Sequence, residues 1–140
     1  MMNLGAMQGV KWKYLLAPIS LNGTAATSLS LDCAGFKYAT IIAGSGLIGA
    51  ADMDQLDLTE SDDDSSYATI SGSAHTDPVQ TDDGILWIWN IDCRKRKRYI
   101  QVNCDPGAVA TLFFVLGCLS VAAEMPDNAT EQGVKAQVIL

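Results

Sequence analysis

The chain has 140 residues, of which 49% are apolar and 18% are charged, and its formal net charge is −7. This length fits a single domain, and this composition excludes a chain that is disordered throughout. The acidic balance also argues against a protein that binds nucleic acid through its overall charge. We expect one domain over residues 1–140, with an N-terminal arm at 1–10 and a C-terminal arm or last strand at 124–140.

Short apolar segments separated by turn-forming residues follow one another along the chain, and no long window shows an apolar stripe at helical spacing. This pattern is typical of an all-β fold, here an antiparallel β-sandwich or jelly-roll-like domain. Pro18 is expected to stop the first strand, and the glycine-rich stretch Gly44–Ala51 to form a mobile loop. The predicted strands are, in chain order, Trp12–Ala17, Ser28–Asp32, Tyr38–Ala43, Gln55–Glu60, Ser66–Ile70, Ile85–Ile91, Arg98–Cys104, Val109–Leu116 and Val134–Leu140.

The segment Ala108–Ala123 carries no charge, which raises the question of whether it spans a membrane. As a helix it would span only about 24 Å, short of the ~30 Å hydrocarbon core of a bilayer. Its residues are β-prone, so we predict a buried strand that bends or ends near Gly117 and no membrane contact.

The segment Ile85–Ile91 is apolar on both faces, which predicts a central strand or one covered by a neighbouring subunit. Large apolar side chains from this and two later strands should fill the space between two sheets. The expected core residues are Trp87, Trp89, Ile100, Leu112 and Phe113.

Residues that could bind a metal or catalyse a reaction are sparse. The chain has four cysteines without a CxxC pair, and its single histidine, His75, lies in a loop sequence and is expected at the surface. Zinc ligands normally come at close spacing, and no serine has a GxSxG setting. We expect no enzyme, no cofactor and no metal site, although the many acids leave a glycosidase-type carboxylate pair open. The cysteines suit small buried side chains, and disulfides stay open because no secretory signal is visible.

An acidic turn at Ser61–Ser65 separates two predicted strands. Asp and Ser favour such turns because their side chains hydrogen-bond nearby backbone groups, so a hairpin is the simplest interpretation. A calcium loop is the alternative, but the DxDxDG spacing is absent and adjacent carboxylates do not converge easily on one ion.

Five of the nine basic residues form one run, Arg94, Lys95, Arg96, Lys97 and Arg98. Adjacent cations repel one another, so the run should seek countercharge. Docking onto an acidic protein surface, such as a second copy, is the favoured interpretation. A solvated loop and phosphate binding are the alternatives.

Two motifs carry a resemblance to a known group of proteins. The chain has Glu60-Ser61-Asp62-Asp63-Asp64-Ser65-Ser66-Tyr67-Ala68-Thr69-Ile70, followed by Lys97-Arg98-Tyr99-Ile100-Gln101-Val102, the turn Pro106-Gly107-Ala108 and a hydrophobic strand. Over roughly Leu31–Ser120 this order resembles small virion proteins of tailed bacteriophages that carry an ESDDG-type hairpin. Asp64 replaces the usual glycine there, which puts the turn type in question, although Asp tolerates left-handed backbone geometry.

The resemblance implies a capsid decoration (cement) protein on the virion surface that binds the major capsid protein and itself, as a homotrimer. Trp12 or the arm Val134–Leu140, including Val138 and Ile139, is then expected to reach a neighbour, with the basic run setting the register. Two alternatives stay open: another virion part (neck, tail or fibre base), and a carbohydrate-binding jelly roll that would use exposed Trp87 or Trp89.

Overall fold

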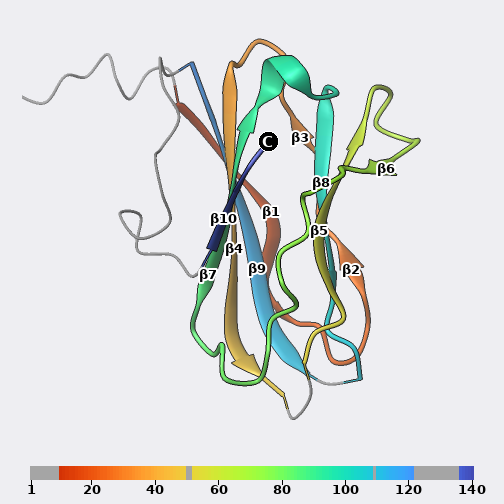
Figure 1. Ribbon diagram of the computed structural model, residues 1–140, viewed down its shortest axis with the longest axis vertical. Coiled ribbons are helices and arrows are strands. Elements are labelled where there is room, and N and C mark those ends of the chain that lie inside the picture. Colours follow the sequence, from red (N-terminus) through yellow and green to blue (C-terminus); the bar gives the residue numbers. More distant parts are fainter. Residues whose placement is uncertain (1–9, 50–51, 109, 122–135) are drawn as a thin grey trace, which may run out of the picture.

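The computed structural model describes residues 10–49, 52–108, 110–121 and 136–140. It confirms the all-β prediction: two five-stranded sheets lie face to face, with the core between them (Figure 1). Within the described ranges, no helix is long and apolar enough to cross a bilayer.

Sheet A has the strand order β1-β9-β4-β7-β10. All of its neighbouring pairs are antiparallel except β10 and β7, which are parallel, so the sheet is mixed. The bounds are Val10–Ser20 for β1, Thr111–Ser120 for β9, Tyr38–Ile48 for β4, Leu86–Asp92 for β7 and Ala136–Ile139 for β10.

Sheet B has the order β2-β8-β5-β6, and β3 also pairs with β8. A short 3-10 turn, η1 (Cys93–Lys95), lies between β7 of sheet A and β8 of sheet B at one end of the sandwich (Figure 1). The bounds are Ala26–Thr27 for β2, Leu31–Asp32 for β3, Gln55–Ser61 for β5, Ala68–Thr69 for β6 and Tyr99–Asp105 for β8.

Four of the five expected core side chains are buried: Trp87, Trp89, Ile100 and Phe113 are at most 2% exposed. Leu112 is the exception, with 50% of its surface exposed. Neighbouring residues of a strand point to opposite faces. Because Phe113 points into the core, Leu112 must point out of the sandwich.

Three strands run past the residues that were expected to end them. β1 continues through Pro18, which an edge strand with an irregular register tolerates. β4 continues through Gly44, where a Cβ would overlap the Phe114 ring, and β9 through Gly117, where a Cβ would lie 3.1 Å from Leu31. These glycines make room for packed side chains and do not break the strands. The expected mobile loop is therefore β4 over residues 44–48, and its residues 50–51 lie outside the described ranges.

Candidate interaction surface

The face of sheet A that points away from sheet B carries almost no charge. Residues paired across strands point to the same side of a sheet, so the register assigns this outer face directly. One row runs Trp12, Cys118, Thr40, Asn90 and Ile139 across the five strands. By this register the described positions of the outer face include one carboxylate, Asp92 on β7. They are Val10, Trp12, Tyr14, Ser20, Tyr38, Thr40, Ile42, Gly44, Leu86, Ile88, Asn90, Asp92, Leu112, Phe114, Leu116, Cys118, Ser120 and Ile139.

Exposure on this outer face is uneven. Trp12 is 57% exposed, Tyr14 64% and Leu112 50%, whereas Ile88 and Asn90 on β7 are buried. The accessible part of the outer face therefore covers β1, β9 and the edge of β4 that adjoins β9. With strands about 4.8 Å apart and about 3.3 Å per residue, this part measures roughly 15 Å by 20 Å, or about 300 Å². Apolar patches of this size are often functional on monomeric proteins.

Sequence reasoning found two residues of this face and missed the others. Trp12 and Ile139 were expected at the surface, and they lie at opposite edges of one row, with Ile139 55% exposed. Tyr14 was not singled out, and Leu112 was assigned to the core. The sequence of β9 contained the signal, because its residues are apolar on both faces of the strand. Only one face can point into the core, so the other must present apolar side chains outward.

The C-terminal strand β10 combines two roles. Val138 pairs with Trp89 and packs against the core, whereas Ile139 points outward. The backbone of Leu140 donates to the Asn90 carbonyl at 2.9 Å and accepts from the Asp92 amide at 2.8 Å. Removal of residues 134–140 would therefore disturb sheet A as well as any contact with a neighbour.

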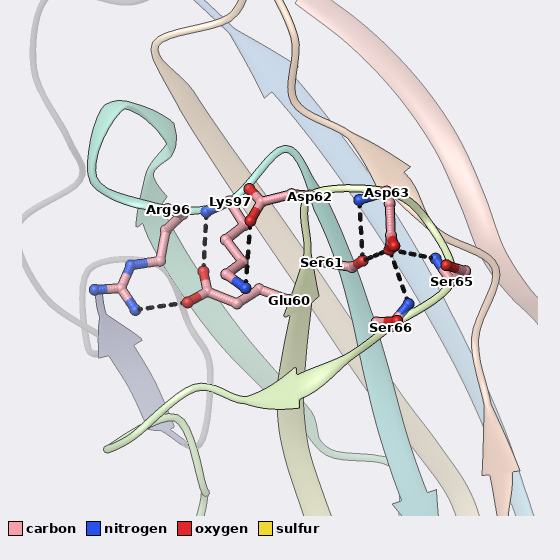
Figure 2. Close-up of polar contacts among 8 residues, drawn as sticks. All are labelled: Glu60, Ser61, Asp62, Asp63, Ser65, Ser66, Arg96 and Lys97. Carbon is pink, nitrogen blue, oxygen red and sulfur yellow. Dashed lines mark hydrogen bonds and ion pairs between the residues drawn. The ribbon is translucent and has the colours of Figure 1, made fainter.

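The basic run finds its countercharge within the same chain. Arg94 and Lys95 lie beside Asp92, with Arg94 Nε 2.8 Å from its carboxylate. Arg96 and Lys97 lie beside the β5–β6 hairpin: Arg96 Nη1 is 3.8 Å from Glu60 and Lys97 Nζ 3.3 Å from Asp62 (Figure 2).

The last residue of the run, Arg98, forms a bidentate ion pair with Asp32, with Nε and Nη2 each 2.8 Å from a carboxylate oxygen. The Arg98 guanidinium lowers the pKa of Asp32 to about 2. All five cations thus have a carboxylate of their own chain within 4 Å. The electrostatic reason for expecting an outside partner here is removed, and the docking role of the run stays a prediction.

The acidic turn is a hairpin whose carboxylates point to different partners. The Asp63 carboxylate accepts hydrogen bonds from the backbone amides of Ser65 and Ser66 and from the Ser61 hydroxyl (Figure 2). These hydrogen bonds, led by that from Ser66, hold the pKa of Asp63 well below its usual range. Asp64 has φ +57°, a left-handed conformation that glycine adopts most easily and that Asp tolerates. The hairpin therefore forms with Asp at this position.

His75 is buried, contrary to the surface position expected for it. It is 6% exposed, its ring centroid lies 4.6 Å from that of Trp89, and its Nε2 is 3.2 Å from the Ile88 carbonyl oxygen. Burial lowers its pKa below the usual value. The indole of Trp89 donates to the Ser73 carbonyl at 2.7 Å. This histidine belongs to the packing of the segment before β7, which a sequence of loop-forming residues did not indicate.

No protein-family model matches the chain, and no curated protein matches it. The fold is similar to that in the crystal structure of PBSX exported protein XepA, with a TM-score of 0.58 and 18% sequence identity. The match covers 85% of this chain and 39% of the XepA chain, so this chain spans about two fifths of that protein. At this identity the similarity concerns the fold.

Proposed function

We propose that this protein is a structural protein of a phage, and more specifically a capsid decoration protein that docks onto the major capsid protein. The observation that carries the proposal is the outer face of sheet A. Aromatic side chains of β1 are exposed there, and the one carboxylate among the described positions, Asp92, lies three strands away on β7. Trp and Tyr are the residues that most often dominate binding energy at protein interfaces.

Two further observations support the phage setting. The hairpin and strand motifs resemble those of tailed-phage virion proteins, and the similar solved structure is that of a PBSX phage protein. Two buried tryptophans speak against the carbohydrate-binding alternative: Trp87 and Trp89, its proposed platform, are 2% and 0% exposed.

The size of the exposed patch favours binding in several copies. About 300 Å² is well below the ~800 Å² that each partner buries in an interface of standard size. A single copy would then bind weakly through this patch alone. A homotrimer on a repeating shell gains affinity because its second and third contacts are intramolecular. We therefore keep the trimer as part of the proposal.

The test is to locate the protein in purified particles of its parent phage. Heads and tails are separated and each is probed with antibody and by mass spectrometry, while light scattering gives the oligomeric state of the free protein. We expect the protein on heads, at many copies per shell, and a trimer in solution. Recovery from the tail fraction alone would favour the neck, tail or fibre-base alternative, and absence from every particle would overturn a virion role.

A further inference from the structure

Two cysteines from opposite sheets meet at one end of the sandwich. Cys33 directly follows β3 of sheet B, and Cys93 directly follows β7 of sheet A as the first residue of η1. Both are free thiols in the core, 4% and 9% exposed. Adjacent backbone contacts bring them together, because the Cys93 amide donates to Lys37 and the preceding residue, Phe36, donates to Cys33. The Cys33 thiol also lies 3.8 Å from the Leu31 carbonyl oxygen.

The backbone on each side of this pair is fixed independently of the thiols. The Cys33 amide donates to the Arg98 carbonyl at 2.8 Å, and the Cys93 amide donates to the Lys37 carbonyl at 2.9 Å. The Cys33 carbonyl also accepts from the Phe36 amide at 3.1 Å, which closes a turn. Disulfide sulfurs lie about 2 Å apart, so two neighbouring thiols on a backbone fixed in this way become bonded when their side chains approach each other.

The other two cysteines lie in different settings. Cys104 is buried in sheet B, where its Sγ is 3.3 Å from the Ala26 carbonyl oxygen. Cys118 is on the outer face of sheet A, in the row between Trp12 and Thr40. These positions make them natural controls for the pair.

We propose that Cys33 and Cys93 form a disulfide that cross-links sheet A to sheet B when the protein meets a small-molecule disulfide such as oxidised glutathione. Cys93 loses its proton to solvent and its sulfur attacks one sulfur of the oxidant, which releases one glutathione thiolate and leaves a mixed disulfide. Cys33 then loses its proton and attacks the Cys93 sulfur, which releases the second glutathione. Two protein thiols are thereby oxidised to one disulfide, and one glutathione disulfide is reduced to two thiols.

The order of these two steps follows from the contacts of each thiol. The Cys33 thiol beside it lowers the pKa of Cys93, which favours the attacking thiolate. The Cys93 thiol, followed by burial, raises the pKa of Cys33. Cys93 is also the more exposed of the two.

The experiment oxidises the reduced full chain with oxidised glutathione, alkylates the remaining thiols after denaturation, and maps the peptides without reduction. We expect two of the four thiols to disappear, with one linked peptide pair containing Cys33 and Cys93. Thermal unfolding should move up by several degrees on oxidation, because the cross-link restricts the unfolded chain. Four titratable thiols after oxidation, or a linked pair that contains Cys104 or Cys118, would overturn the proposal.

Variants separate the pair from general thiol oxidation. Cys104→Ser should still lose two thiols and gain thermal stability on oxidation, whereas Cys93→Ser should form no intramolecular disulfide and show no such gain. The peptide map of the unmodified chain decides the matter even if Cys93→Ser folds poorly, because that readout needs no substitution.

Discussion

The basic run Arg94–Arg98 and the outer face of sheet A differ in how their side chains are satisfied. The five cations have carboxylates of the same chain within 4 Å. On the outer face, Trp12 and Tyr14 keep more than half of their surface exposed. The most conspicuous charge cluster of the sequence therefore has little left to gain from a partner, whereas exposed aromatic surface gains free energy when another protein covers it.

The comparison teaches that a run of like charges says little about function until the positions of its counterions are known. Asp32, Glu60, Asp62 and Asp92 are far apart in the chain, yet they meet the run at one end of the sandwich. An apolar face cannot be neutralised by the chain in this way. It needs a covering surface, and this makes it the better candidate for a docking site.

The largest expected effect is on particle binding by a variant that carries Trp12→Ala and Tyr14→Ala. Interface aromatics commonly contribute about 2 kcal/mol or more each, so affinity for purified heads should fall by about 100-fold or more. Thermal stability should change little, because both side chains are exposed. Binding of the fluorescently labelled protein to heads, measured by co-sedimentation, gives the affinity.

Leu29→Ala is the matched control, since Leu29 is 53% exposed and lies in the segment between β2 and β3. It should bind as the unmodified protein does. Equal affinities for the aromatic variant and this control would remove the outer face as the docking site.

A smaller effect is expected when the ion pair of Arg96 and Glu60 is broken. Glu60→Gln keeps an acceptor for the Lys97 amide, 3.0 Å away, but leaves the half-buried Arg96 without its carboxylate. We expect a loss of about 1 kcal/mol in the free energy of unfolding, measured by urea denaturation, and unchanged particle binding.

Asp62→Asn provides the comparison within the same hairpin. Its pair with Lys97 is 3.3 Å long, but the Asp62 side chain is 73% exposed. Exposed pairs contribute little, so its loss should stay below about 0.5 kcal/mol. If the two variants had equal free energies of unfolding, the run would be a solvated surface loop whose ion pairs contribute nothing to stability.

The strands themselves were largely predictable, because alternation and turn residues are local signals. Ile85–Ile91 was placed within one residue of β7, and the hairpin around the acidic turn forms as expected. The strand ends were wrong at Gly44 and Gly117, since their role is to admit Phe114 on one face and Leu31 on the other. Those contacts come from distant segments, and no local pattern shows them.

The candidate surface was predictable only in part, for a related reason. A period of two residues shows that a strand has two faces, but it does not show which face is inside when both are apolar. Leu112 was placed in the core for this reason. Trp12 was expected at the surface because the resemblance implied a contact with a neighbour. Its exposure follows from its position on β1, an edge strand of sheet A, and the sheet order is not a local signal.

A pH-dependent effect should separate stability from binding. The pKa of His75 is lowered by burial, so the unfolded chain takes up a proton below about pH 6.5 while the folded protein resists it. The free energy of unfolding should therefore fall as the pH drops below 6.5 and be constant with respect to this group above it. Asp32, with a pKa of about 2 in the folded protein, loses its contribution only at lower pH, below its usual value of 3.8.

Urea midpoints at pH 7.5 and pH 5.0 test this dependence, with His75→Gln as the variant that cannot titrate. The chain has one histidine, so the difference between the two midpoints should shrink in the variant. Head binding by the folded protein should be equal at both pH values. The one carboxylate among the described positions of the outer face is Asp92, and its hydrogen bond from Arg94 lowers its pKa, so it stays ionised at both. A binding loss at pH 5.0 without unfolding would point to a titrating contact outside this face.

The smallest effect is expected for Lys95→Gln, which examines the basic run where it is most available to a partner. The Lys95 side chain is 73% exposed, the highest value of the five, and its Nζ lies 3.9 Å from Asp92, which Arg94 already neutralises. Stability should therefore change by no more than about 0.3 kcal/mol, and head affinity by less than about twofold.

A docking contact through this run would instead weaken several-fold on substitution, and its affinity would fall steeply as salt rises, because exposed charge pairs are screened within about 8 Å at physiological ionic strength. Binding through the outer face predicts the opposite, an affinity that barely changes with salt, so a salt series on the unmodified protein and on Lys95→Gln decides which of the two regions makes the contact.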